Sequence, residues 1–246
     1  MVPAHPRGGR RLVRRALAAA LAISLLAGCS WTRGGAAART LPADRDAPIV
    51  YVALGDSTVE GIGASRPELN YVSRLSARLR EVYRHARVEN LGVGGATSID
   101  VLARQLDRAV ALAPDLVTLS VGPNDITERV PLADYTRNVE TIFRRLVAET
   151  PAVLVVNLLP DLAVTPRFRG HEAEAVVARR SIEFNAALAR LAKRHGVDIV
   201  DLYAPSQREV PARPELMAGD GYHPSDVGYA RWAELMWEAI RSRIRA

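Results

Sequence analysis

The sequence predicts an α/β fold in which helices cover both faces of one parallel β-sheet. Two observations carry this prediction: five short apolar runs recur along the chain, and segments with helical spacing of apolar residues separate them. Parallel strands joined by helices are buried on both faces, which produces such nearly continuous apolar runs. The predicted strands are 49–54, 88–91, 116–121, 153–158 and 197–202.

The order of these strands is restricted by the right-handed crossover that joins parallel strands of one sheet. We expect the order 2-1-3-4-5, which is a three-layer, doubly wound sandwich with five strands. Ligands of such sheets bind beyond the carboxyl ends of the strands. A functional site is therefore expected in the segments that follow each strand.

Five helices are predicted, starting near residues 71, 98, 134, 172 and 225, each with apolar residues three or four positions apart. Pro114 is expected to end the second helix and Gly196 the fourth. Asp134 and Ser225 are expected to be the N-caps of the third and fifth helices. The residues expected to face the core are Tyr71, Leu75, Leu79, Val82, Ile99, Leu102, Leu106, Ala109, Val110, Tyr135, Val139, Ile142, Phe143, Leu146, Val177, Phe184, Leu188, Leu191, Trp232, Leu235, Met236, Ala239 and Ile240.

The charge of the chain is concentrated at its start. The 246 residues carry a formal net charge of +6, but residues 1–28 contain five arginines and no acidic residue. The remainder holds 28 basic and 27 acidic residues, so the globular part is almost neutral. Without a basic stripe, we expect no nucleic acid partner.

The N-terminus is typical of a targeting segment. A basic region up to Arg15 precedes a short apolar run, 16–27, which ends in Leu26-Ala27-Gly28-Cys29. This pattern resembles the lipobox of bacterial lipoproteins, in which cleavage before the cysteine leaves Cys29 to be lipidated. A plain secretory signal and a short membrane anchor remain as alternatives.

These patterns divide the chain into three parts. We expect a lipoprotein signal peptide over 1–28, a flexible tether over 29–47, and one domain over 48–246. The domain is expected to work outside the cytoplasm, attached to the bacterial membrane through the lipid on Cys29, or secreted. Because Cys29 is the only cysteine, the domain has no internal disulfide and no thiolate metal site.

Four polar segments follow the predicted strands. Each segment alone is explained by a turn, since glycine, proline, asparagine and aspartate favour turns. Together they supply the parts that acyl transfer needs, namely a hydroxyl nucleophile, an imidazole, a carboxylate and N–H donors. The segments are Gly55-Asp56-Ser57, residues 90–98 with the run Gly92-Val93-Gly94-Gly95, Gly122-Pro123-Asn124-Asp125, and Asp220-Gly221-Tyr222-His223.

The ordered set resembles the SGNH, or GDSL-type, hydrolase family over residues 49–240. The four segments above match its four sequence blocks in order, although Thr58 stands where the family usually has leucine. The resemblance implies a flavodoxin-like fold and hydrolysis of carboxylic esters, without a metal ion or an organic cofactor. It also implies a small-molecule, lipid or glycan ester as substrate.

The resemblance assigns a role to each matched residue. Ser57 would attack the ester carbonyl, His223 would carry the proton, and Asp220 would orient and stabilise the imidazole. The oxyanion hole would consist of the backbone N–H groups of Ser57 and Gly95 and the side-chain amide of Asn124. Asp56, Asp125 and Asn90 are expected to hold their turns instead of taking part in the chemistry.

Other features of the sequence allow different interpretations. The glycine run 92–95 lacks the third glycine of a dinucleotide fingerprint, because Thr97 occupies that position. His171 and the glutamates after it are typical of a helix start, not of a metal site. A binding protein of the same fold without turnover, and an acyltransferase using the same acyl-enzyme, remain as alternatives.

The sequence gives little information on the substrate and the oligomeric state. Loops 159–171 and 203–222 show no clear acyl tunnel, and we expect a monomer.

Overall fold

The computed structural model describes residues 39–245. The predicted signal peptide, 1–28, lies outside the described residues, and so do Cys29 and the first part of the predicted tether. Within 39–245, no helix combines the length and the apolar character that are needed to cross a bilayer.

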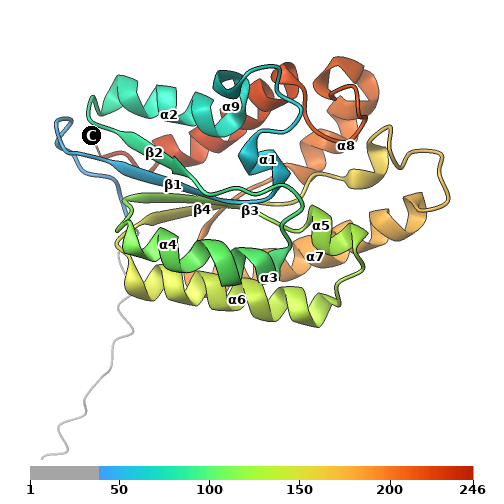
Figure 1. Ribbon diagram of the computed structural model, residues 1–246, viewed down its shortest axis with the longest axis horizontal. Helices are drawn as coiled ribbons and strands as arrows, with labels where there is room; N and C mark the ends of the chain where they lie inside the picture. Colours follow the sequence, from blue (N-terminus) through green and yellow to red (C-terminus); the bar gives the residue numbers. More distant parts are fainter. Residues whose placement is uncertain (1–38, 246) are drawn as a thin grey trace, which may run out of the picture. The chain divides into compact units, whose positions relative to one another are not determined.

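The sheet contains five parallel strands in the order β2-β1-β3-β4-β5, which confirms the predicted topology (Figure 1). β1 is the second strand in this order and pairs with β2 on one side and β3 on the other. Its Tyr51 lies opposite Val88 of β2 and Leu116 of β3. The strands are β1 (Val50–Gly55), β2 (Arg87–Asn90), β3 (Leu116–Ser120), β4 (Val153–Asn157) and β5 (Asp198–Val200).

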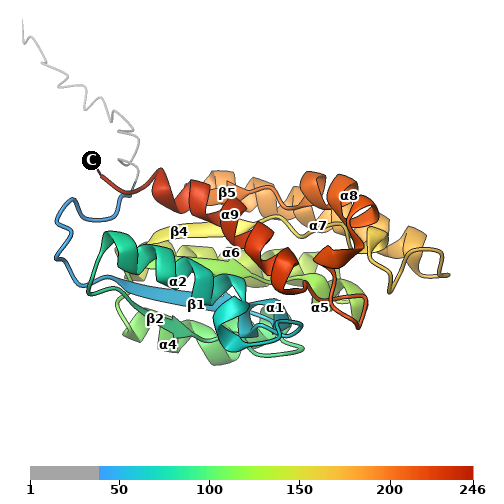
Figure 2. The ribbon, with the colours of Figure 1, turned by 90° about the horizontal axis from the view of Figure 1, so that it is seen from above.

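Helices cover both faces of this sheet, and the core is divided into two halves accordingly. α2 (Tyr71–Val82) and α9 (Asp226–Arg241) lie side by side on one face (Figure 2). α4 (Leu106–Ala111), α6 (Leu132–Glu149) and α7 (Glu174–His195) cover the other face. The alternation of β1 explains the division: Tyr51 and Ala53 pack toward α2 and α9, whereas Val52 and Leu54 pack toward α4, α6 and α7.

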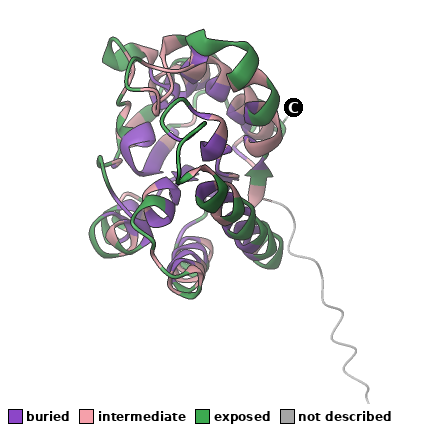
Figure 3. Ribbon diagram, turned by 90° about the vertical axis from the view of Figure 1, so that its right-hand side faces the viewer, coloured by how far each residue is buried: buried purple, intermediate pink, exposed green. Residues whose placement is uncertain are grey.

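Short helices surround the carboxyl ends of the strands. Viewed from this end of the sheet, buried residues line the inner sides of the helices and exposed residues lie along the rim (Figure 3). The short elements are α1 (Ser57–Glu60), α3 (Ser98–Asp100), α5 (Pro123–Thr127), α8 (Tyr203–Ala212) and the 3₁₀ turns Pro67–Leu69, Leu162–Val164 and Pro214–Leu216.

Two details of the predicted helices are wrong. α6 begins at Leu132, after Pro131, and Asp134 lies in its first turn and not at the cap. The second predicted helix is interrupted by a π-helical segment, Val101–Gln105, between α3 and α4. The wider turn shifts the helical phase, so Val101 is fully buried, whereas Ile99 is 51% exposed instead of facing the core.

The boundary between tether and domain is also corrected by the structure, because residues 39–47 pack on the domain. Leu41 is fully buried, and its backbone N–H donates to the Arg243 carbonyl at 2.7 Å. The Arg39 guanidinium donates to three backbone carbonyls at the end of α6, including that of Thr150 at 2.8 Å. The composition of this segment gave no periodic signal, because its order comes from contacts with the C-terminal end of the chain.

Candidate active site

Ser57 lies at the junction of β1 and α1, as the sequence predicts. β1 ends at Gly55, Asp56 is the N-cap, and Ser57 is the first residue of α1. The Gln105 side chain clamps the end of the strand, since its amide accepts from the Gly55 N–H at 2.9 Å and donates to the Gly55 carbonyl at 2.8 Å. Ser57 is therefore held by backbone geometry at the carboxyl end of the sheet.

The cap of α1 is a buried carboxyl. Asp56 is fully buried and accepts hydrogen bonds from the Thr58 N–H at 2.9 Å and the Thr58 hydroxyl at 2.8 Å. Its second oxygen has no partner in the described part of the chain. Burial raises the pKa of Asp56 to about 6, although the hydrogen bonds from Thr58 oppose the shift. Thr58, which stands where the family usually has leucine, thus stabilises the Asp56 cap through both hydrogen bonds.

His223 lies on a turn that is closed by its own carboxylate partner. One oxygen of Asp220 accepts from the backbone N–H groups of Tyr222 and His223, both at 2.9 Å. The turn is closed further by the Ala218 N–H, which donates to the His223 carbonyl at 2.8 Å. Asp220 is therefore held by backbone hydrogen bonds in addition to its contact with the imidazole.

The turn packs closely against the segment that follows α1. Gly63 has φ +96°, and a Cβ at this position would lie 2.5 Å from the Pro224 carbonyl oxygen and 2.9 Å from the His223 Cβ. The Tyr229 hydroxyl donates to the Ile62 carbonyl at 2.6 Å, and Asp226 accepts from Ser65. Ser225 caps α9, which confirms the predicted cap. The start of α9 thereby holds the turn at residues 218–223, which we call the histidine turn, close to the segment that follows α1.

Ser57, His223 and Asp220 form one line of hydrogen-bonding contacts. The Ser57 Oγ lies 2.9 Å from the His223 Nε2, and the His223 Nδ1 lies 2.6 Å from the second oxygen of Asp220. Burial raises the pKa of Asp220, but hydrogen bonds from His223 and from the backbone outweigh it and lower the pKa overall. Asp220 is therefore ionised at neutral pH and favours the tautomer with a proton on Nδ1.

Gly95 and Asn124 face the same opening as Ser57 and His223. A cleft of about 260 Å³, which we call the polar chamber, is lined by Ser57, Ile62, Gly94, Gly95, Asn124, Thr127, Arg167, Tyr222 and His223. Gly95 has φ +77° and no protein atom within 4 Å of a Cβ built on it, so glycine suits the backbone and leaves the space open. Within residues 39–245, neither the Ser57 N–H nor the Gly95 N–H donates a hydrogen bond to protein.

A buried network fixes the loops that carry Gly95 and Asn124. Asp125 is fully buried and accepts from the Ser98 N–H at 2.9 Å and from the Ser98 hydroxyl at 2.6 Å. The Asn138 amide also donates to the Ser98 hydroxyl, at 3.0 Å. Burial raises the pKa of Asp125 against these hydrogen bonds. Asn90 supports α1 in a similar way, because its amide donates to the Val59 carbonyl at 2.7 Å.

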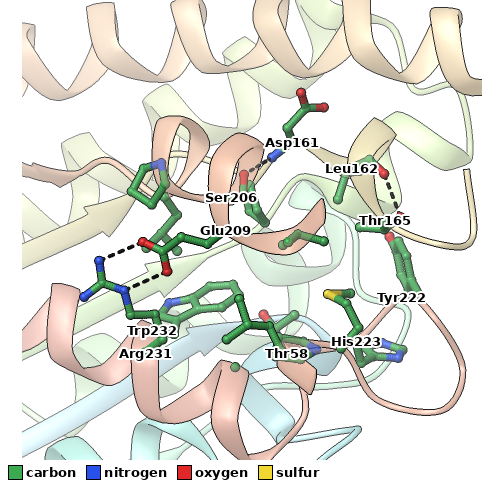
Figure 4. A pocket seen from close by; sticks show the side chains of 18 of the residues that line it. Thr58, Asp161, Leu162, Thr165, Ser206, Glu209, Tyr222, His223, Arg231 and Trp232 are labelled. Carbon is green, nitrogen blue, oxygen red and sulfur yellow. Dashed lines mark hydrogen bonds and ion pairs between the residues drawn. The ribbon is translucent and has the colours of Figure 1, made fainter. Parts of the chain in front are cut away.

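A second cavity opens on the other side of Ser57 and His223. This cavity, which we call the apolar pocket, measures about 100 Å³ and lies among α8, α9 and the 3₁₀ turns Leu162–Val164 and Pro214–Leu216 (Figure 4). Apolar side chains dominate its lining, including Leu162, Leu202, Val210, Leu216 and Trp232. The sequence showed no tunnel here, because α8 was not predicted: Pro205 and Pro211 masked a helix within 203–222.

The structure thus brings Ser57, Asp220, His223, Gly95 and Asn124 together at one end of the sheet. Sequence reasoning missed the residues of the apolar pocket. The Arg167 guanidinium lies at the polar chamber, 4.9 Å from the centre of the Tyr222 ring. No group of three or more histidine, cysteine or acidic residues suited to a metal ion occurs in the described residues.

Comparison with known proteins gives a consistent result. The model of the GDSL-like lipase/acylhydrolase family matches residues 53–231. A GDSL-like esterase of Mycobacterium tuberculosis is 30% identical over 87% of this chain and 68% of its own length. An acetylxylan esterase of Geobacillus stearothermophilus is 27% identical, with 77% of this chain and 95% of that protein covered.

Solved structures show the same fold. A lipase/acylhydrolase from Enterococcus faecalis superposes with a TM-score of 0.65 at 23% identity, covering 80% of this chain and 97% of that one. The acetylxylan esterase Axe2 from Geobacillus stearothermophilus gives a TM-score of 0.62 at 20% identity, over 80% and 96% of the two chains. At these identities the likeness concerns the arrangement of the sheet and helices.

The buried carboxyl at the α1 cap predicts a specific pH dependence of stability. Between about pH 4, near the pKa of an unfolded aspartate, and the folded value of about 6, the unfolded state binds fewer protons. The free energy of unfolding therefore falls as the pH rises through this window. Replacing Asp56 by Asn keeps an N-cap acceptor and removes the ionisation.

Between pH 4 and pH 7, we expect the free energy of unfolding of the wild type to fall by up to about 3 kcal/mol relative to that of Asp56→Asn. The measurement is chemical denaturation of both proteins across this range, with agreement in slope expected below about pH 4. Parallel profiles up to pH 7 would show that Asp56 ionises as readily in the folded chain as in the unfolded one.

Proposed function

The chain belongs to the GDSL-like lipase/acylhydrolase family, also called SGNH hydrolases, and on that premise we propose that it hydrolyses carboxylic esters through an acyl intermediate on Ser57. The observation that carries this proposal is the line of contacts from the Ser57 Oγ to His223 and Asp220. The names of its relatives, which include a GDSL-like esterase and an acetylxylan esterase, support the reaction class.

The first half of the proposed reaction acylates Ser57. The Ser57 Oγ attacks the ester carbonyl carbon while the His223 Nε2, 2.9 Å away, accepts the hydroxyl proton. The carbonyl oxygen becomes an oxyanion. When the tetrahedral intermediate collapses, His223 donates the same proton to the departing alcohol oxygen, and the acyl group remains on Ser57.

The second half releases the acid. His223 accepts a proton from water, the resulting hydroxide equivalent attacks the acyl carbon, and the proton returns to the Ser57 Oγ. Asp220 keeps Nδ1 protonated and stabilises the imidazolium through the 2.6 Å contact. The proposed steps use only side chains, backbone N–H groups and water, so they invoke no cofactor.

Three N–H groups around the polar chamber suit the oxyanion. The backbone N–H groups of Ser57 and Gly95 make no hydrogen bond to the described protein, so they are available to a substrate oxygen. The Asn124 amide donates to the Ala96 carbonyl at 3.0 Å. An amide NH₂ has two hydrogens, so this contact orients Asn124 and leaves one hydrogen for the oxyanion.

Substitutions at these positions test the mechanism through turnover of p-nitrophenyl esters. We expect Ser57→Ala and His223→Ala to lower kcat by at least about 10⁴-fold, with His223→Ala at least as severe as Asp220→Ala. Asn124→Ala, which removes one oxyanion donor, should lower kcat by about 10²–10³-fold. His171→Ala, an exposed histidine, serves as the matched control and should leave kcat unchanged.

All variants should retain the wild-type circular dichroism spectrum. A His223→Ala protein with wild-type turnover would contradict the assignment of the base. Full turnover in Ser57→Ala would contradict the acyl-enzyme itself.

We further propose that the protein is anchored outside the cytoplasm through a lipid on Cys29. The support is the sequence alone: a basic region, an apolar run and the segment Leu26-Ala27-Gly28-Cys29. The substrate would then be met at or near the membrane surface.

A cysteine substitution tests the anchor in a bacterial host that processes lipoproteins. The wild type should partition into the detergent phase and carry a lipid on its N-terminal peptide in mass spectrometry. Cys29→Ser should move to the aqueous phase with its esterase activity intact. A wild-type protein that stays in the aqueous phase without a lipid adduct would show that the segment is an ordinary secretory signal.

A further inference from the structure

We propose that the apolar pocket binds the acyl chain of the substrate, so that esters of about four to eight acyl carbons are preferred over acetyl esters. This inference rests on the proposed function, because it places the acyl group on Ser57. It goes beyond that function in naming the substrate class that this chain selects.

The apolar pocket begins at the reacting atoms. Ser57 and His223 line both the apolar pocket and the polar chamber, so an acyl carbon bound to the Ser57 Oγ lies between the two cavities. The oxyanion donors belong to the polar chamber, which directs the carbonyl oxygen to that side. The remaining substituent of the acyl carbon is its alkyl chain, and this chain can then enter the apolar pocket.

The chemistry of the two cavities separates the two halves of an ester. The apolar pocket is lined mainly by leucine, proline, valine, methionine and tryptophan side chains, which favour an alkyl chain. The polar chamber contains Asn124, Thr127 and the Arg167 guanidinium. A polar alcohol group is therefore favoured in the polar chamber, and the acyl chain in the apolar pocket.

The walls of the apolar pocket are firmly connected to the fold. The Ser206 hydroxyl of α8 accepts from the Asp161 N–H at 2.8 Å, and the Gln207 amide donates to the Asp161 carboxylate at 3.0 Å. These contacts hold α8 against the loop that follows β4. The pocket is therefore formed before a substrate arrives, which reduces the ordering cost of binding.

The size of the pocket sets the length of the chain. Its volume of about 100 Å³ is several times the roughly 10–15 Å³ that one water needs on the same measure. A methylene is similar in size to a water molecule, so an acetyl methyl group would leave most of the space empty. A chain of about four to eight carbons uses it.

An ion pair limits the pocket at the side away from His223. The Arg231 guanidinium donates to the two Glu209 carboxylate oxygens at 2.9 and 3.0 Å, and Figure 4 shows the pair across the pocket from His223. An alkyl chain that reached this pair would separate or desolvate two charges without replacing their contacts, which is costly. Longer chains are therefore disfavoured.

The test is a panel of p-nitrophenyl esters from acetate to dodecanoate with the wild-type protein. We expect kcat/KM to rise by up to about fourfold per methylene, to exceed the acetate value at least tenfold at its maximum between butyrate and octanoate, and to fall for longer chains. A maximum at acetate, as the name of the acetylxylan esterase relative would suggest, overturns the inference and leaves the proposed hydrolase intact.

A pair of valine substitutions links this preference to the pocket. Val210 of α8 lines the pocket, so Val210→Phe should fill it and lower the ratio of kcat/KM for hexanoate to kcat/KM for acetate at least tenfold. Val176 is exposed on α7, and Val176→Phe is the matched control, expected to behave as the wild type. Equal losses on hexanoate and acetate in Val210→Phe would overturn the assignment of the pocket.

Binding without turnover distinguishes the inference from the function on which it rests. Trp232 lines the pocket, so titration of Ser57→Ala with octanoate should change tryptophan fluorescence in a saturable way, whereas acetate should not. Saturable octanoate binding combined with no hydrolysis of any ester in the wild type would overturn the proposed function and keep the pocket. Ester hydrolysis without saturable octanoate binding would overturn the assignment of the pocket and keep the proposed function.

Discussion

The contact between the Ser57 Oγ and the His223 Nε2 is the constraint on which the site depends, because the two residues are 166 positions apart in the chain. Neither β1 nor the histidine turn creates this contact alone. It requires the close approach of the turn to Gly63, the bond from Tyr229 to Ile62, and the cap of α9 at Ser225. The start of α9 thus packs against the segment that follows α1, and the parallel sheet brings Ser57 and the turn with His223 to one edge.

Buried polar groups make this edge rigid at a cost in stability. Asp56 and Asp125 are both fully buried carboxyls with raised pKa values, and each is held by neighbouring hydroxyl and N–H groups. Satisfied networks of this kind specify one arrangement, because every alternative leaves a polar group without a partner. Of these two carboxyls, only Asp56 has an oxygen without a hydrogen-bond partner in the described residues. The site is therefore fixed by its supports before a substrate binds.

The sequence predicted the strands, their order and the clustering of the four polar segments, because apolar runs and turn residues are local signals. It did not predict α8 or the apolar pocket, because Pro205 and Pro211 resemble loop signals and the cavity arises from contacts between distant elements. The same limitation explains the error at 39–47, where order comes from pairing of Leu41 with Ile244. At Ile99 the π-helical segment broke the regular spacing on which the prediction relied.

We propose that Ser57 becomes the acyl carrier because His223 activates it across this long-range contact. The most direct measurement is brief reaction with an alkyl fluorophosphonate, followed by peptide mapping by mass spectrometry. We expect one adduct per chain, on the Ser57 hydroxyl, and a large decrease in its rate of formation in His223→Ala. An adduct on another residue, or labelling of Ser57 at an unchanged rate without His223, would contradict it.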